Sequence, residues 1–202
     1  MTGTAKATRA RTKGKAADAR REILKVAARM MRENGYADMS LRDLAAEVGM
    51  KAGSLYYHFP SKEDLATEVM RLGVEMVEEA VTDALEQSRK LSPRDRLVLA
   101  MRVHLKTLLS ESDFSSAHIR CYPFVPETVR AELKTVRRAY DQVWNNIIAA
   151  YLGTDAEPQE IRHLRYTLIG AMNWSLEWFN AEKDDVEAYI ASIAALLPVR
   201  KN

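Results

Sequence analysis

Cysteine is nearly absent from the 202-residue chain, and no long apolar run is present. The single cysteine, Cys121, cannot form an intrachain disulfide, and metal sites built on two cysteines are excluded. Nowhere do about 18 apolar residues follow one another, so the sequence predicts no membrane-spanning helix. Lys25 and Arg29 interrupt the first apolar segment, so we expect no signal peptide. Together these absences predict a cytoplasmic protein.

A large excess of charge of one sign is also lacking, since the net charge is only +2. The distribution is uneven: residues 1–21 contain seven basic residues and one acid, Asp18, whereas the remaining 23 basic and 27 acidic residues leave a mildly acidic body. Residues 1–15 show no apolar periodicity and are predicted to form a flexible basic arm. This arm would hold nucleic-acid phosphates electrostatically, or it is a solvated tail or cloning remnant.

Helix signals dominate the chain, and no stretch alternates convincingly as a strand would. Three Ser-x-x-Asp patterns, which begin at Ser40, Ser61 and Ser92, are typical of helix N-termini. Gly35 and Gly153 are placed to end helices. We therefore expect an all-α fold of about nine helices. They cover residues 16–34, 41–48, 51–59, 62–87, 93–109, short broken turns within 114–125, 126–152, 158–179, and a last helix capped by Asp184 and Glu187 that ends near Leu197.

Two short helices separated by a glycine turn, within residues 41–59, make a candidate helix-turn-helix. If Leu55 and Phe59 are buried, the helical rotation directs Gly53, Ser54 and Tyr57 outward. A glycine there lets a duplex approach the backbone closely, and the polar side chains offer hydrogen bonds to phosphates or bases. Lysines lie near the starts of two helices, at 51 and 62, where a phosphate would relieve their repulsion by the helix dipole.

The segment 48–65, VGMKAGSLYYHFPSKEDL, closely resembles the DNA-binding motif of the TetR family of bacterial transcriptional regulators. With Gly35-Tyr36 and SLRDLA at 40–45, the resemblance covers roughly residues 16–66. Family members commonly have Ser and then Lys after Gly-Val, whereas here Lys51 lies one position earlier. The expected domains are the arm at 1–15, the DNA-binding domain at 16–66 and an effector-binding and dimerisation domain at 67–202. The DNA-binding candidates are Ser40, Arg42, Lys51, Ala52, Gly53, Ser54, Tyr56, Tyr57, His58 and Lys62.

The resemblance implies a homodimer that reads palindromic operator DNA and binds a small effector in its C-terminal domain. In such proteins the last two helices of each chain form the dimer interface. Here those helices contain small and branched apolar residues suited to close packing. These are Leu164, Leu168, Ala171, Met172, Ser175, Val186, Ile190, Ile193 and Leu197.

For the effector site, the resemblance points to the space enclosed by the fifth to eighth expected helices. The candidate lining residues are mainly apolar and aromatic with a few polar groups, as in small-molecule pockets. They are Leu105, Leu109, Phe114, Tyr122, Phe124, Tyr140, Trp144, Asn173, Trp174 and Trp178. Ordinary core packing is the alternative for each aromatic residue. The short segment GAMNW at 170–174 with Glu177-Trp178 is similar to family members that sense fatty acyl-CoA and related lipids.

Other chemistry-bearing residues show no pattern of a site. His104, His118 and His163 are not gathered by spacing, so we expect no metal site. Arg137-Arg138 and the pair Arg162 and Arg165 are interpreted as solvated helix faces, although a phosphorylated effector would also suit them. Cys121 is expected to be a buried apolar residue.

The sequence thus predicts an effector-responsive transcriptional repressor, without cofactor or catalytic residues. A drug sensor of the same class is one alternative to a lipid sensor. A helical enzyme with an incidental helix-turn-helix is another, but no nucleophile and base are brought together by spacing, and no glycine-rich phosphate loop is present. The operator, the regulated genes, the sign of regulation and the effector are left open.

Overall fold

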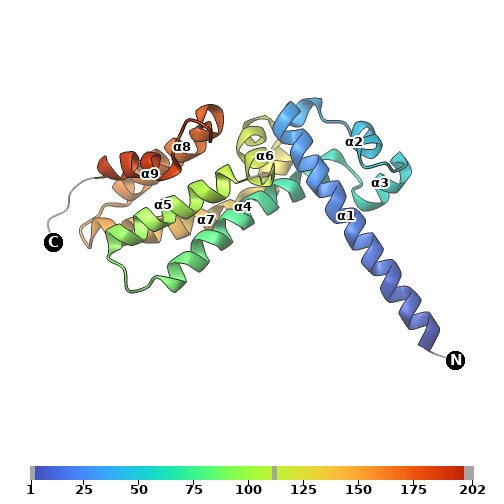
Figure 1. Ribbon diagram of the computed structural model, residues 1–202, viewed down its shortest axis with the longest axis horizontal. Helices are drawn as coiled ribbons and strands as arrows, with labels where there is room; N and C mark the ends of the chain where they lie inside the picture. The colour runs from blue at the N-terminus through green and yellow to red at the C-terminus, as the bar shows by residue number, and fades with distance from the viewer. Residues whose placement is uncertain (1–2, 111–112, 198–202) are drawn as a thin grey trace.

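A computed structural model describes residues 3–110 and 113–197, with side chains from residue 16 onward. The described residues form nine α-helices, one short 3₁₀ helix and no strand (Figure 1), which confirms the predicted all-α fold. The elements are α1 (Gly3–Asp38), α2 (Leu41–Glu47), α3 (Ala52–His58), α4 (Lys62–Gln87), α5 (Pro93–Leu109), α6 (Asp113–Cys121), η1 (Tyr122–Phe124), α7 (Glu127–Leu152), α8 (Pro158–Trp178) and α9 (Val186–Ala195).

Most expected helix boundaries agree with these elements to within a few residues, and the differences have local causes. The helical backbone of α1 is broken at Gly35, which has φ +80°, so the predicted stop is confirmed. Its start at Gly3 precedes the expected residue 16; the side chains of 1–15 lie outside those described, so the basic arm stays a prediction. Asp185, not Asp184, caps α9, because Asp184 instead accepts a hydrogen bond from the Asn180 N–H at 2.8 Å.

Serine side chains fix the starts of three helices, as predicted. The hydroxyls of Ser40, Ser61 and Ser92 accept hydrogen bonds from the backbone N–H three residues later, at 3.0 to 3.2 Å. Each hydroxyl also donates to the carboxylate of the aspartate at that position, at 2.5 to 2.7 Å. Each cap satisfies a backbone donor that the helix itself leaves unpaired.

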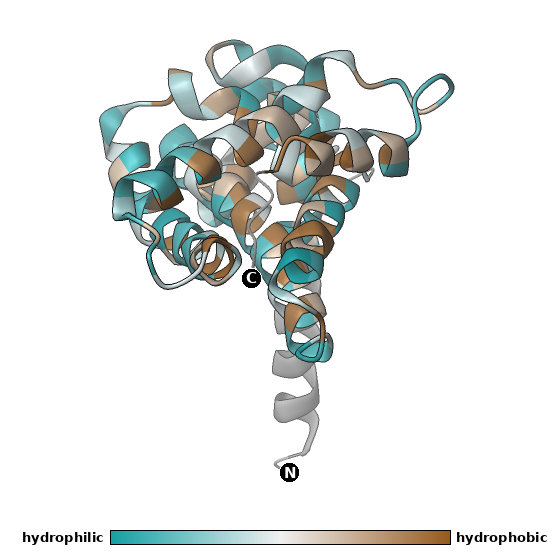
Figure 2. Cartoon of the chain, turned by 90° about the vertical axis from the view of Figure 1, so that its left-hand side faces the viewer, coloured by the Kyte–Doolittle hydropathy of each residue, from teal (hydrophilic) through white to brown (hydrophobic). Residues whose placement is uncertain are grey.

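Two hydrophobic cores lie along the elongated molecule. Figure 2 shows that hydrophobic and hydrophilic residues alternate along its helices, as expected of helices with one buried face. The first core joins α1, α2, α3 and the start of α4 to α6 and the start of α7, through residues such as Leu44, Leu55, Ala117 and Cys121. The second core lies among the remainder of α4 and α5, α7, α8 and α9. The expected domain boundary at residue 66 falls inside α4, and it stays a prediction.

The faces of α8 and α9 differ from the expectation. Leu168, Met172, Ser175, Ile190, Ile193 and Leu197 are buried within the single chain. Assigning these side chains to an interface between two copies was therefore wrong, because they are already covered within the chain, and all but Ser175 pack in its second core. The exposed apolar side chains of these helices include Tyr166, Trp174 and Trp178 on α8. No described helix has the length and apolar character needed to cross a membrane.

Candidate functional site

The helices α2 and α3 are held against α1 by a shared core and by polar contacts. Leu44 and Leu55 are fully buried between them. The turn between α2 and α3 requires Gly49, which has φ +72°, a conformation that other residues rarely adopt. Arg29 on α1 donates to Glu47 on α2 at 2.6 Å. This arrangement fixes the direction in which α3 faces solvent.

The exposed face of α3 is the one that the sequence predicted, because Leu55 and Phe59 are buried as expected. Tyr57 is 84% exposed and Tyr56 52% exposed, while Ser54 and the glycine before it also face solvent. A Cβ atom added at Gly53 would meet no heavy atom within 4 Å, so the helix backbone is open to close approach. No acidic residue occurs from position 48 to position 62. The surface can therefore approach a polyanion without local repulsion.

Some of the residues that flank α3 are exposed, whereas others are half-buried against other parts of the protein. Lys51, at the N-cap without a side-chain hydrogen bond, and Arg42 on α2 are exposed. Lys62 is half-buried; its Nζ donates to the Ala37 carbonyl at 2.9 Å and lies 4.5 Å from the centre of the Tyr36 ring. His58 is half-buried and lines a groove toward α7.

The last two DNA-binding candidates, Ala52 and Ser40, are placed by the same geometry. Ala52 lies exposed beside Lys51, whereas the Ser40 hydroxyl is engaged as the cap of α2. The hydroxyl of Tyr36 donates to Glu63 at 3.2 Å, and burial together with this carboxylate raises the pKa of Tyr36 to about 12. This contact joins the end of α1 to the start of α4 and so supports the position of α3.

A cavity of about 180 Å³ lies among α4, α5, α6, η1, α7 and α8, within the region where an effector was expected. Of the ten predicted lining residues, Tyr122, Tyr140 and Asn173 lie at this cavity. The other seven do not line it. Leu105 and Trp144 are fully buried in the second core, Phe114 packs against the first core, Leu109 lines a separate surface groove, and Phe124, Trp174 and Trp178 are exposed.

A hydrogen-bonded chain crosses one wall of the cavity. His104 Nδ1 lies 2.7 Å from the hydroxyl of Tyr140, and His104 Nε2 lies 3.1 Å from Asn173 Oδ1. Since an amide oxygen only accepts, Nε2 carries the proton and Tyr140 donates to Nδ1. Burial lowers the pKa of His104 to about 4, and burial followed by the charge of Glu78 raises the pKa of Tyr140. The hydrogen-bonded side chains of His104, Tyr140 and Asn173 are therefore all neutral at pH 7.

A second cluster of polar side chains at the cavity consists of His118, Tyr122 and Arg137. Arg137 Nη1 lies 3.0 Å from His118 Nε2, and the Arg137 guanidinium carbon lies 3.8 Å from the centre of the Tyr122 ring. Burial and the neighbouring guanidinium lower the pKa of His118 to about 3. Interpreting Arg137 as part of a solvated helix face was wrong, since it lines the cavity.

Three of the cavity's polar residues, His104, His118 and Arg137, were not among the predicted ligand contacts. They lie on α5, α6 and α7, and no sequence spacing joins them. Arg165 likewise proves buried, paired with Asp141 at 2.8 Å, rather than solvated. Among the described residues, no group of three His, Cys, Asp or Glu side chains is arranged to hold a metal ion. Cys121 is buried as predicted, and burial raises the pKa of its thiol.

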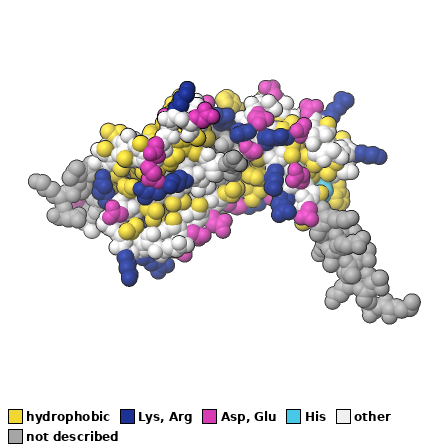
Figure 3. Space-filling model, in the orientation of Figure 1, with side chains coloured by type: hydrophobic (Ala, Val, Ile, Leu, Met, Phe, Trp, Pro, Cys, Tyr) yellow, Lys and Arg dark blue, Asp and Glu magenta, His cyan; other side chains and the backbone are white. Residues whose placement is uncertain are grey.

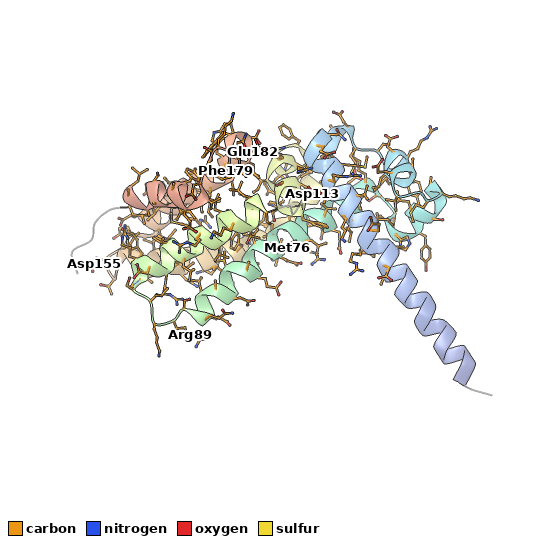
Figure 4. The ribbon with its side chains drawn as sticks, viewed as in Figure 1. Met76, Arg89, Asp113, Asp155, Phe179 and Glu182 are labelled. Atoms are coloured by element: carbon orange, nitrogen blue, oxygen red, sulfur yellow. The ribbon has the colours of Figure 1, made fainter. Side chains whose placement is uncertain are left out.

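Helices α4 and α6 approach each other closely at the cavity wall. A Cβ atom added at Gly73 would lie 2.3 Å from the carbonyl oxygen of Phe114. The hydroxyl of Ser115 donates to the Gly73 carbonyl at 3.0 Å. Asp113, which is labelled at the start of α6 in Figure 4, pairs with Arg32 of α1 at 2.9 Å. Helix α6 therefore contacts both the cavity and the helix that supports α2 and α3.

An exposed apolar surface lies at the end of the molecule formed by α8 and α9, where hydrophobic side chains reach the surface (Figure 3). Trp174 is 66% exposed and Tyr166 62% exposed, two turns apart on α8. Gly170 lies between them and is also exposed, and Leu196, just after α9, is 84% exposed. Large aromatic side chains on one face of a helix are typical of protein interfaces.

Comparison with known proteins connects both parts of the chain to one family. Residues 23–69 match a family model described as bacterial regulatory proteins, tetR family, and residues 90–197 match one described as Tetracyclin repressor-like, C-terminal domain. The HTH-type transcriptional repressor KstR2 of Mycobacterium tuberculosis is 41% identical over 61 residues. That segment is 30% of this chain and 30% of KstR2, so the match spans less than a third of this relative.

Two further comparisons cover most of the chain. The Fatty acid metabolism regulator protein of Bacillus subtilis is 22% identical over 184 residues, which are 87% of this chain and 92% of that protein. The crystal structure of AibR in complex with isovaleryl coenzyme A and operator DNA has the same fold, with a TM-score of 0.77, 22% identity, and coverage of 89% of this chain and 97% of that one. Because the C-terminal family model alone matches more than half of its residues, the chain belongs to the TetR family of bacterial transcriptional regulators.

Proposed function

We propose that this chain is a cytoplasmic, homodimeric transcriptional repressor that leaves a palindromic operator when a small hydrophobic effector occupies the cavity. The observation that carries this proposal is the exposed polar face of α3 on a rigid three-helix support, within a chain that also encloses a cavity. A regulator of this kind needs a surface that binds DNA and a cavity that binds the effector, and here the two are separate parts of one fold.

The DNA contact is assigned first to Lys51, Ser54 and Tyr57, which are exposed and whose side chains make none of the hydrogen bonds described for this structure. In a helix-turn-helix protein the second helix enters the major groove, and flanking cations contact phosphates. Lys62 is a lesser contact, because its ammonium group already binds the end of α1. Gly53 lets the backbone of α3 approach the duplex closely.

The DNA part is tested by selection from a random duplex pool, followed by fluorescence anisotropy with the enriched sequence. We expect a palindrome whose half-sites are centred about 34 to 36 Å apart. Lys51→Ala is expected to weaken binding and to reduce its salt dependence, whereas Lys134→Ala, an exposed lysine on α7, serves as the matched control. Tyr57→Phe, which removes only the hydroxyl, is compared with Tyr57→Ala. Unchanged affinity in both Lys51→Ala and Tyr57→Ala would reject this assignment.

The homodimer is assigned to the exposed face of α8 and α9 around Tyr166, Trp174 and Leu196. Covering these side chains removes apolar surface from water, which favours association. Sedimentation of the purified chain tests this: we expect a dimer, with Trp174→Glu shifting the chain toward monomer. Phe124→Glu, a substitution at an aromatic residue exposed in η1, is the control.

The effector is assigned to the class of short acyl compounds, including acyl-CoA. A cavity of about 180 Å³ is smaller than the usual range of about 300 to 1,000 Å³ for drug-sized ligands. This size favours a short acyl group over the bulky compounds of a drug sensor. Similarity to AibR, whose crystal structure contains isovaleryl coenzyme A, and to a fatty acid metabolism regulator supports the same class.

Release from the operator is the test of the effector. Anisotropy of the protein–operator complex is followed during titration with isovaleryl-CoA, longer acyl-CoAs and a panel of cationic and aromatic drugs. We expect short acyl compounds to weaken operator binding by a coupling free energy of about 1 to 3 kcal/mol. Release by drugs alone would replace the acyl assignment with the drug-sensor alternative.

A further inference from the structure

The cavity wall contains a cation without an anionic partner. Arg137 forms no ion pair with a carboxylate of any described residue; its contacts are the neutral ring of His118 at 3.0 Å and the face of Tyr122 at 3.8 Å. A guanidinium group stays charged at all physiological pH values, so this positive charge cannot be removed by proton loss. It has five N–H donors, of which His118 uses one.

The other ionisable groups of the wall do not neutralise Arg137. His118 accepts its hydrogen bond through Nε2 and is therefore neutral. Asp141, one turn along α7, is engaged with the buried Arg165 at 2.8 Å. Glu78 lies near Tyr140 but does not line the cavity. The cavity thus presents one net positive charge to whatever occupies it.

The remaining wall is suited to a short alkyl group. Val74, Val77, Leu108 and Ile169 line the cavity with aliphatic side chains. Its volume of about 180 Å³ leaves room for a short branched alkyl chain. Asn173 adds a side-chain NH₂ group whose hydrogens are not used by His104, which is bonded to the amide oxygen.

We infer that Arg137 is an anion-binding residue of the effector cavity, and that the cavity selects a short aliphatic acyl chain joined to a negatively charged group. The alkyl group packs against the aliphatic wall, and Arg137 binds the anion by charge-assisted hydrogen bonds. The anion is the carboxylate of a free short-chain acid or a phosphate of its CoA thioester. This inference rests on the proposed effector cavity and adds the charge requirement to it.

The test compares three ligands by isothermal titration calorimetry at pH 7: isovalerate, its neutral isostere isovaleramide, and isovaleryl-CoA. Arg137→Gln removes the charge but keeps an N–H donor for His118, and Arg137→Lys retains the charge. Arg138→Gln, a substitution at the adjacent exposed arginine on α7, is the matched control. Thermal unfolding and operator affinity without ligand show that each variant is folded.

We expect the wild-type chain to bind isovalerate at least tenfold more tightly than isovaleramide. Arg137→Gln is expected to weaken binding of the acid by a factor of about 10 to 100 and to leave binding of the amide unchanged. Arg137→Lys restores part of this preference, and Arg138→Gln binds like the wild type. If isovaleryl-CoA alone binds and Arg137→Gln weakens it to the same degree, the anion is the phosphate.

Three results would overturn the inference: measurable and equal binding of acid and amide by the wild type, equal binding of the anionic ligands by Arg137→Gln and the wild type, or binding of none of the three ligands. Operator binding is measured on the same samples. If the inference about Arg137 is wrong but the protein still binds the operator, the proposed repressor function is not affected. Absence of operator binding refutes that function, whatever the calorimetry shows.

Discussion

Replacing Gly73 with alanine is expected to force α4 and α6 apart at the cavity wall. The added Cβ would lie 2.3 Å from the Phe114 carbonyl oxygen, 2.7 Å from its carbonyl carbon and 3.0 Å from the Ser115 nitrogen. Favourable contacts between non-bonded heavy atoms occur at about 3.5 to 4.0 Å, so the two helices must separate by roughly 1 Å. All three obstructing atoms belong to the backbone, and rotation of a side chain cannot relieve the clash.

The expected free-energy change is a difference between two effects. Overpacking in a well-packed core costs about 1 to 3 kcal/mol, and we take the upper end because backbone must move. Replacing glycine by alanine within a helix gains about 1 kcal/mol. The net destabilisation is therefore about 2 kcal/mol. For a chain of this size, that corresponds to a fall in Tm of roughly 4 to 8 °C.

Thermal and urea unfolding of Gly73→Ala measure this effect, and Gly53→Ala is the matched control. Gly53 is also helical, but a Cβ atom there would meet nothing within 4 Å. The control is expected to be unchanged or stabilised by up to about 1 kcal/mol. A Gly73→Ala protein as stable as the wild type would refute the close contact between α4 and α6.

Three other perturbations have defined outcomes. His104 and His118 have folded-state pKa values of about 4 and 3, below the unfolded value of about 6.5, so the unfolded chain binds the extra protons and stability falls as the pH drops below 6.5. We expect the free energy of unfolding, measured in urea, to fall by about 1.5 kcal/mol for each histidine between pH 6.5 and 5. In His118→Gln the slope of the free energy of unfolding against pH should be half as steep. A free energy of unfolding that does not change over this pH range would contradict the pKa assignments of both histidines. Lys62→Met loses its hydrogen bond to the end of α1 and should unfold about 1 kcal/mol more easily in the absence of DNA, whereas a pure phosphate contact predicts no change. Asp141→Asn leaves the buried Arg165 without its partner and should cost about 2 kcal/mol, less than a fully buried pair because Asp141 is 45% exposed; a loss below about 0.5 kcal/mol would show that the pair is unimportant.

The helix-turn-helix was predictable because its signals are local. Ser40, Gly49 and the alternation of buried and exposed positions on α3 act within one or two helical turns, and the structure agrees with each. Lys62 shows the limit of this reasoning. Its position suggested a phosphate contact, but Ala37, 25 residues away, supplies a carbonyl that the sequence could not reveal.

The cavity was only partly predictable because tertiary packing selects its residues. Trp144 and Tyr140 lie one turn apart on α7, yet the first is in the core and the second reaches the cavity. Apolar periodicity identifies the buried face of a helix, but it does not show whether a residue on that face packs in the core or lines a cavity. His118 and Arg137 come together only because α6 and α7 both pack against α4, which no spacing in the sequence records.

Helix α6 connects the proposed effector site to the core that supports α2 and α3. Ser115 and His118 line the cavity, while Ala117 and Cys121 on the same helix belong to the core that supports α2 and α3. The Cys121 thiol also donates to the carbonyl of Met31 on α1 at 3.3 Å. A ligand that moves α6 by a fraction of an ångström must therefore repack α1, because close-packed interiors transmit strain. Since α1 holds α2 through the shared core, such a movement would also change the orientation of α3, and we expect the proposed effector binding to be linked to operator binding.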